Sequence, residues 1–124
     1  MSKVAIAGTG QTKFSKDDDD IEKLLFESAS NCLQSTNNLD LNNIDGVLVS
    51  TNNNSKYLGA ILSETMGIQP KISHSIEHLC SSGTNAIISA YAYISSGLSD
   101  MVLVSGAESA TNPGQVLEWD KSRG

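Results

Sequence analysis

The stretch from Glu77 to Ala86, which reads Glu-His-Leu-Cys-Ser-Ser-Gly-Thr-Asn-Ala, decides how the rest of the chain is interpreted. Before it, residues 72–78 alternate Ile or His with Ser or Glu, and this period of two predicts a β-strand. After it, residues 80–96 predict a helix that Gly97 closes. Cys80 is therefore expected at a strand-to-helix junction on the carboxyl edge of a sheet, where open α/β folds bind ligands.

The helix that begins at Cys80 has an unusual composition. No charged residue occurs between Leu79 and Ser99, although a crossover helix on a protein surface normally has a charged face. Its many Ser, Thr and Asn residues make it too polar for a bilayer. We therefore expect protein to cover this helix on all sides, either between two sheets or between this chain and another.

The rest of the chain alternates strand and helix patterns. Short apolar runs predict three further strands, at Val4–Gly8, within Ile44–Ser50, and at Met101–Val104 with an end at Gly106. Apolar residues at helical spacing predict two further helices, one from Ile21 to Leu33 and one from Tyr57 to Met66 with Gly67 as its cap. The expected order is β-α-β-α-β-α-β, which favours an α/β fold with a mostly parallel sheet.

Composition excludes several classes of function. The 124 residues fit one domain, and 14 Asp and Glu against 8 Lys and Arg give a net charge of −6. An acidic chain is a poor partner for nucleic acid or an anionic membrane surface. No stretch of 18 apolar residues is present, so no membrane span is expected. Two Cys residues and no visible signal peptide favour a reducing, cytoplasmic setting.

Three other features have ordinary explanations. The acidic run Asp17–Asp20 fits a solvated helix start, where the helix dipole favours anions, better than a metal site. Gly8-Thr9-Gly10 lacks the third Gly of a dinucleotide loop, because Lys13 stands in its place. Cys32 lies on the apolar face of the first helix and is interpreted as structural. We therefore expect no metal and no bound nucleotide cofactor.

Cys80 is the candidate for chemistry. A helix N-terminus favours a thiolate over a thiol, and the thiolate is the nucleophile. The alternative is a small buried Cys with a packing role. Position alone leaves both interpretations open.

The residues after Cys80 narrow the choice. Cys80–Ala86 resembles the acyl-enzyme motif of the thiolase family, in which Cys, Ala or Ser, Ser, Gly, two variable residues and a small residue follow one another. Glu77 and Thr84 depart from the best-known form and resemble the divergent archaeal and sterol-carrier-like branch. Residues 4–10, 44–47 and 106–109 look like early strands of that branch, so the resemblance covers essentially the whole chain.

The resemblance implies a fold. Residues 1–109 would be the N-terminal βαβαβαβ portion of a five-layer thiolase-like fold, with the nucleophile helix buried in the central layer. Residues 110–124 would start the following loop region, and Trp119 there would pack against the part of the family fold that comes later.

It also implies an activity. Cys80 would form an acyl thioester, and its backbone N–H would help to hold the oxyanion. The acyl group would pass to an acetyl-CoA enolate in a Claisen condensation, or a 3-ketoacyl-CoA would be cleaved by CoA. Coenzyme A thioesters are then substrates, and no cofactor is bound permanently. The alternatives are a ketoacyl or hydroxymethylglutaryl-CoA synthase, or a non-catalytic thiolase-like subunit.

The same resemblance leaves parts of the family site without a counterpart. The family's activating His and second, acid-base Cys come later than the residues matched here. His74 and His78 do not match either of them, and both are expected to point off a strand face. A missing C-terminal portion or a complementary chain would supply these groups. Residues 72–78 would pair with their copy across a two-fold axis in a homo-oligomer.

Overall fold

The computed structural model describes residues 3–15, 20–37, 39–52 and 55–109, and it has the expected α/β character. Most of the acidic run at 17–20 and the tail at 110–124, with Trp119, lie outside the described residues. The elements are, in chain order, α1 (Ile21–Gln34), the 3-10 turn η1 (Leu41–Asn43), β1 (Gly46–Ser50), α2 (Leu58–Met66), β2 (Ile72–Ile76), the 3-10 turn η2 (Leu79–Ser81), α3 (Ser82–Ser95) and β3 (Val102–Gly106).

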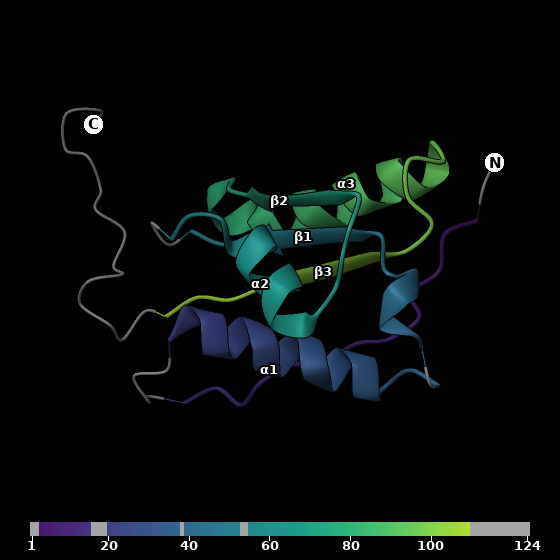
Figure 1. Cartoon of the computed structure of the whole chain (residues 1–124). Helices are drawn as coiled ribbons and strands as arrows, with labels where there is room; N and C mark the ends of the chain where they lie inside the picture. Colours follow the sequence, from purple (N-terminus) through teal and green to yellow (C-terminus); the bar gives the residue numbers. More distant parts are fainter. Residues whose placement is uncertain (1–2, 16–19, 38, 53–54, 110–124) are drawn as a thin grey trace, which may run out of the picture.

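The three strands form a parallel sheet in the order β2-β1-β3 (Figure 1). All five residues of the central strand β1 are buried, as its apolar run Val47-Leu48-Val49 predicts for a strand covered on both faces. Leu48 is in register with His74 on one side and with Val104 on the other. The outer edges of β2 and β3 pair with no strand of the described chain.

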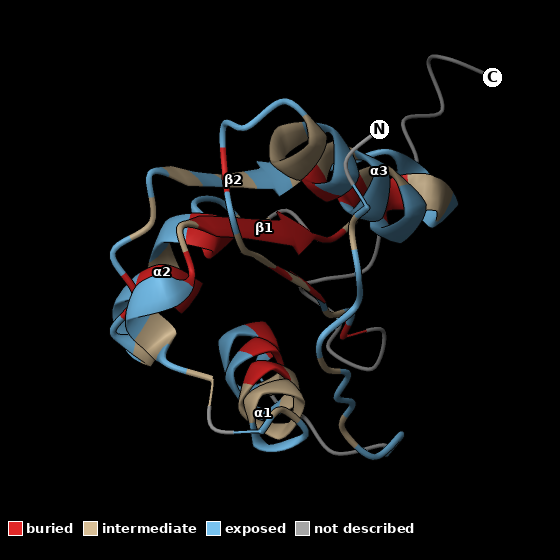
Figure 2. Cartoon of the chain, turned by 90° about the vertical axis from the view of Figure 1, so that its right-hand side faces the viewer, coloured by how far each residue is buried: buried red, intermediate tan, exposed pale blue. Residues whose placement is uncertain are grey.

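The helices form two layers around the sheet. Figure 2 shows α1 and α2 on one face and α3 on the other. Side chains alternate along β1, so Val47 and Val49 face α1 and α2, while Leu48 faces α3. The core between the sheet and the first two helices consists of ten buried residues: Ile21, Leu25, Ala29, Ile44, Val47, Val49, Leu58, Leu62, Ile68 and Leu103.

Two glycines end helices as the sequence predicts. Gly67 after α2 has φ 71° and Gly97 after α3 has φ 77°, which is the left-handed conformation that glycine adopts without steric cost. The helix starts differ more from expectation. Tyr57 precedes α2 rather than opening it, with a φ of 61°, and Cys80 lies in η2, before the first residue of α3.

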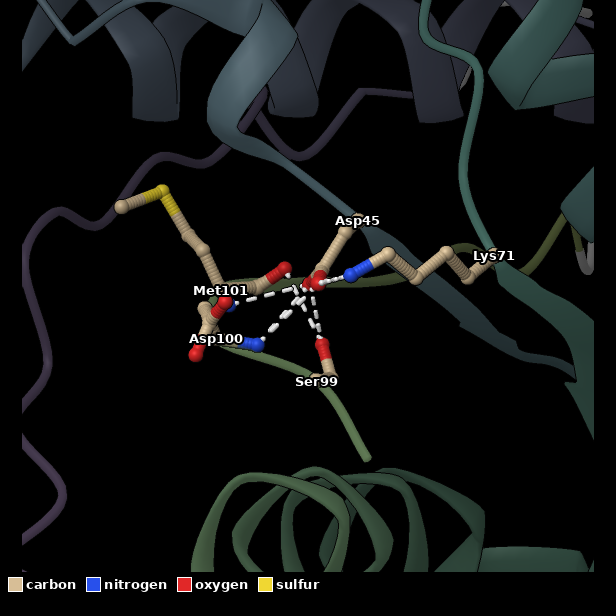
Figure 3. A network of polar contacts seen from close by, with 5 residues as sticks. All are labelled: Asp45, Lys71, Ser99, Asp100 and Met101. Carbon is tan, nitrogen blue, oxygen red and sulfur yellow. Dashed lines mark hydrogen bonds and ion pairs between the residues drawn. The ribbon is translucent and has the colours of Figure 1, made fainter. Parts of the chain in front are cut away.

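A carboxylate at the amino edge of the sheet ties the strand starts together (Figure 3). Asp45, directly before β1, accepts hydrogen bonds from the backbone amides of Asp100 and Met101, both at 3.1 Å, and from the Ser99 hydroxyl. Lys71 Nζ lies 3.1 Å from its other oxygen. Partial burial raises the pKa of Asp45, but the hydrogen bonds from Ser99, Met101, Lys71 and Asp100 outweigh this effect. The pKa of this carboxyl therefore lies well below its usual range.

The first expected strand is absent. Residues 4–8 form no strand, and Ile6 is 83% exposed. An isolated apolar run has no partner for its backbone amides and carbonyls, and no strand of the described chain pairs with this one. The following residues contact α1 instead, because Thr9 N–H donates to Ser35 Oγ at 2.9 Å and Asn31 Nδ2 donates to the Gln11 carbonyl at 2.9 Å. The prediction of a buried strand at Val4–Gly8 is wrong for this chain.

Helix α3 is covered on one side only. Ala86 and Ala90 pack toward the sheet and are buried. Ile87, Ile88 and Tyr91 are about half exposed, at 59%, 59% and 47%. The uncharged helix therefore presents an apolar outer face that nothing in the described chain covers.

Candidate active site

Cys80 lies where the sequence predicts, at the carboxyl edge of the parallel sheet. The turn η2 joins the end of β2 to the start of α3, and Cys80 is its central residue. Its side chain is an exposed free thiol. Chain segments that follow the other two strands, around Asn52 and Glu108, reach the same edge.

The backbone before Cys80 is held in an uncommon conformation. Leu79 has φ 50°, and it is one of two non-glycine residues with a positive φ in the described chain. Its N–H donates to the Glu77 carboxylate at 2.9 Å. Residues in this region of φ/ψ space persist only where their surroundings enforce them, so this contact is part of what shapes the turn.

The Ser82 hydroxyl fixes the other side of the turn. Ser82 is only 5% exposed, and its Oγ accepts the His78 N–H at 2.7 Å. The same oxygen lies 2.7 Å from the Leu79 carbonyl and 3.2 Å from Asn52 Oδ1, either of which can accept its single proton. Ser82 therefore links the start of α3 to the end of β2 and to the segment after β1.

The segments after β1 and β3 are also connected. The Asn52 N–H donates to the Glu108 carboxylate at 2.6 Å. Nearby, Ser28 and Ser105 share a hydrogen bond of 3.2 Å between α1 and β3. The sequence interpretation did not single out Asn52, Ser82 or Glu108 as site residues. The signal available for Asn52 and Glu108 was their place just after a predicted strand, the position that the Cys80 argument uses.

The amide of Cys80 is the available donor of this turn. The Leu79 N–H is engaged by Glu77, and the Ser81 N–H donates to the His78 carbonyl at 3.1 Å. Among the described residues, the structure gives the Cys80 N–H no acceptor. A backbone donor beside the thiol of its own residue is suitably placed to stabilise negative charge on the oxygen of a carbonyl that the thiol attacks.

Cys80 opens onto a hollow of about 1140 Å³. Residues 4–15 form one wall, residues 100–109 form another, and α1 and α3 contribute side chains to the rest. The hollow therefore runs beside the open edge of β3. Cys32 of α1 also lines it, but burial raises the pKa of the Cys32 thiol and disfavours its reactive thiolate form.

The two histidines have different environments. His74 lies within β2 and its Nε2 is 2.9 Å from the Tyr93 hydroxyl of α3, with the two rings edge to face. It is thus a packing residue between sheet and helix. His78 lies past the end of β2, and its Nδ1 is 2.6 Å from the hydroxyl of Ser81, the residue that follows Cys80. Of the two histidines, His78 is therefore the one hydrogen-bonded to the turn that contains Cys80.

The described residues hold neither a cluster of metal-binding side chains nor a membrane-spanning helix. Nowhere in them do three or more His, Cys, Asp or Glu side chains gather as a metal ion would need. None of their helices is long and apolar enough to cross a membrane.

The fold and the cysteine junction define a class of α/β protein in which an exposed Cys lies between a parallel strand and the helix that follows it. Comparisons with known proteins identify the class. The family described as thiolase, N-terminal domain, matches residues 4–122. The chain belongs to the thiolase family, and the part that it represents is the N-terminal domain.

Individual relatives agree with this assignment. An acetyl-CoA acetyltransferase from Methanocaldococcus jannaschii is 31% identical over 118 residues, which are 90% of this chain and 30% of that protein. A hydroxymethylglutaryl-CoA synthase from Thermococcus onnurineus is 32% identical over 71 residues, which are 56% of this chain and 20% of the relative. The chain thus spans less than a third of the length of these curated relatives.

Solved structures support the fold. An acetyl-CoA acetyltransferase from Syntrophomonas wolfei is similar with a TM-score of 0.76 and 22% identity, over 94% of this chain and 31% of that one. A β-ketoacyl-[acyl carrier protein] synthase III from Thermus thermophilus is similar with a TM-score of 0.70 and 22% identity, over 86% and 33%. The thiolase-like fold expected from the Cys80–Ala86 motif is confirmed.

Proposed function

We propose that this chain is the nucleophile-bearing part of a thiolase-type acyltransferase and that Cys80 forms the acyl-enzyme. The observation that carries the proposal is the position of Cys80, which is exposed at the sheet edge beside a backbone N–H without an acceptor in the described chain. The family membership and the acetyl-CoA acetyltransferase relatives support the same assignment.

The reaction has two steps. In the first, the Cys80 thiolate attacks the thioester carbonyl of an acyl-CoA, and the Cys80 N–H stabilises the oxyanion while the CoA thiolate leaves. In the second, the enolate carbon of acetyl-CoA attacks the acyl carbonyl, a carbon–carbon bond forms, and the Cys80 thiolate leaves. The reverse direction cleaves a 3-ketoacyl-CoA with CoA. Coenzyme A thioesters are the substrates, and no permanently bound cofactor takes part.

The second step needs groups that the described residues do not bring to Cys80. Removing a proton from acetyl-CoA requires a base, and His78 is the one histidine at the site. We propose that a further portion of the protein, or a complementary chain, supplies the activating His and the acid-base Cys of the family. Two surfaces suit such an addition: the apolar outer face of α3 at Ile87, Ile88 and Tyr91, and the open edge of β3 along the hollow.

A synthase of the same superfamily is the second candidate. The Thermococcus hydroxymethylglutaryl-CoA synthase relative favours it, but its match covers only about half of this chain. The two functions differ in product. A thiolase converts acetoacetyl-CoA and CoA into two molecules of acetyl-CoA, whereas the synthase condenses acetoacetyl-CoA with acetyl-CoA. A non-catalytic subunit would do neither, and Cys80 would stay unacylated.

Assembly and location complete the proposal. We propose a homo-oligomer in which the open edge of β2, within residues 72–78, pairs with its copy. Unpaired edges invite such contacts, and Ser73 and Ser75 are exposed there.

We propose a cytoplasmic location because both Cys32 and Cys80 are free thiols, which suits a reducing compartment.

By the complete protein we mean residues 1–124 together with the further portion or complementary chain proposed above. The test is an assay of thiolysis and condensation with the complete protein, with its Cys80→Ala variant, and with residues 1–124 alone. Acetoacetyl-CoA should be cleaved by the complete protein only. Sustained cleavage by residues 1–124 alone would show that no further portion is needed. Condensation with acetyl-CoA without cleavage would favour the synthase. Turnover that survives in Cys80→Ala would refute the assignment of the nucleophile.

A further inference from the structure

We propose that Glu77 is a positioning residue for Cys80, because its carboxylate sets the orientation of the peptide that carries the Cys80 N–H. The inference rests on the proposed function, since it assumes that this N–H stabilises an oxyanion. It adds a role for a residue that does not touch the acyl group.

The backbone conformation of Leu79 is unusual. Its φ of 50° lies in a region that residues other than glycine seldom occupy. Leu79 is 50% exposed, so packing covers only about half of it. Polar contacts in the turn add to what holds this conformation.

The polar side-chain contacts of Leu79 in this turn come from Glu77 and Ser82. The Glu77 carboxylate accepts the Leu79 N–H at 2.9 Å. The Ser82 hydroxyl lies 2.7 Å from the Leu79 carbonyl and accepts the His78 N–H. Of the two, only Glu77 binds the amide of Leu79 itself.

Leu79 controls the direction of the peptide plane that follows it. The peptide plane between Leu79 and Cys80 carries the Leu79 carbonyl and the Cys80 N–H, and the Leu79 dihedral angles set its direction. Ser82 alone does not fix this plane, because its single proton can go to the Leu79 carbonyl or to Asn52 Oδ1. If Glu77 releases the Leu79 N–H, Leu79 can leave the left-handed region, and the Cys80 N–H then turns away from the thioester oxygen.

Two reactions of Cys80 differ in whether they need its backbone N–H. Acylation by acetyl-CoA passes through an oxyanion and needs the N–H in place. Alkylation by iodoacetamide is a direct displacement at a saturated carbon and develops no oxyanion. A positioning role therefore predicts that loss of Glu77 slows acylation far more than alkylation.

The experiment compares Glu77→Ala, Glu77→Gln and the control Glu64→Ala in the complete protein. Glu64 is an exposed residue of α2. Rates of acylation by acetyl-CoA and of alkylation by iodoacetamide are measured at Cys80 by peptide mapping. Glu77→Ala should slow acylation about tenfold at saturating acetyl-CoA, with alkylation within about twofold of the unsubstituted protein. Glu77→Gln keeps a carbonyl acceptor and should stay within about threefold in both reactions. Glu64→Ala should change neither rate.

Three results would overturn the inference: normal acylation of Glu77→Ala, equal losses of acylation and alkylation, or a Glu77→Gln variant as slow as Glu77→Ala. The last would mean that the charge matters rather than the acceptor. If the unsubstituted protein is not acylated at Cys80, the proposed function fails and this inference fails with it. Normal acylation in Glu77→Ala would leave the proposed function intact.

Discussion

The carboxylate of Asp45 accepts the backbone N–H of Met101 at 3.1 Å, and this contact joins the residues before β1 to those before β3. The two residues are 56 positions apart in the sequence. The same carboxylate also holds the Asp100 amide and the Ser99 hydroxyl, so it fixes the register of the sheet at its amino edge. Cys80 lies at the opposite edge, after β2.

We predict that Asp45→Asn lowers the free energy of unfolding by about 2 kcal/mol, because the partly buried donors Ser99 and Met101 lose a charged acceptor. Lys71→Ala is the matched control. Lys71 is 69% exposed and Asp45 only 13%, and an ion pair with one partner in solvent contributes about 1 kcal/mol at most. Urea unfolding of the three proteins measures this. A larger loss in Lys71→Ala than in Asp45→Asn would contradict the assignment.

The low pKa of Asp45 also predicts a dependence on pH. Partial burial raises this pKa, but the hydrogen bonds outweigh that effect, so the folded value lies below the unfolded value of about 3.9. A lowered carboxyl pKa stabilises the fold above the unfolded pKa, and the stabilisation is lost as pH falls through the folded one. The stability difference between the unsubstituted protein and Asp45→Asn should be full at pH 6 and shrink below about pH 4. A difference that grows on acidification would contradict this account.

The two cysteines should differ in reactivity. Cys80 is exposed at the start of a helix, whereas burial raises the pKa of Cys32 on α1. We predict that a short pulse of iodoacetamide modifies Cys80 at least about tenfold faster than Cys32 in the complete protein. Peptide mass mapping gives both rates from one sample. Equal labelling, or a preference for Cys32, would count against Cys80 as the activated thiol.

The open edge of β2 should be an assembly surface. Introducing a charge on an exposed edge residue with Ser75→Lys should shift the complete protein toward monomer, because edge charges oppose strand pairing. Lys56→Ser, at an exposed position outside β2, is the control. Light scattering after gel filtration measures the mass. An unchanged oligomer in Ser75→Lys, or a cross-linking map that leaves residues 72–78 free in every assembly, would oppose the proposal.

The sequence predicted the fold class and the place of Cys80 because both follow from local patterns. Alternation in residues 72–78, glycine caps at Gly67 and Gly97 and a buried apolar β1 all appear in the structure. The strand at Val4–Gly8 failed because a strand also needs a neighbour, and an apolar run does not reveal whether one is present.

The finer geometry of the site could not be predicted for a related reason. The positive φ of Leu79 has no sequence signal, since Leu rarely adopts it. The contacts of Ser82 with Asn52, and of Asn52 with Glu108, join residues 30 and 56 positions apart. Such contacts depend on strand order, which the sequence alone leaves open.

The central claim is that Cys80 carries the acyl group. The most direct measurement incubates the complete protein with isotopically labelled acetyl-CoA, quenches in acid and maps the label by peptide mass spectrometry. We predict one labelled acetyl group on the peptide that contains Cys80, present in Cys32→Ala and absent in Cys80→Ala. Label on Cys32, label that persists in Cys80→Ala, or no labelled peptide at all would contradict the central claim.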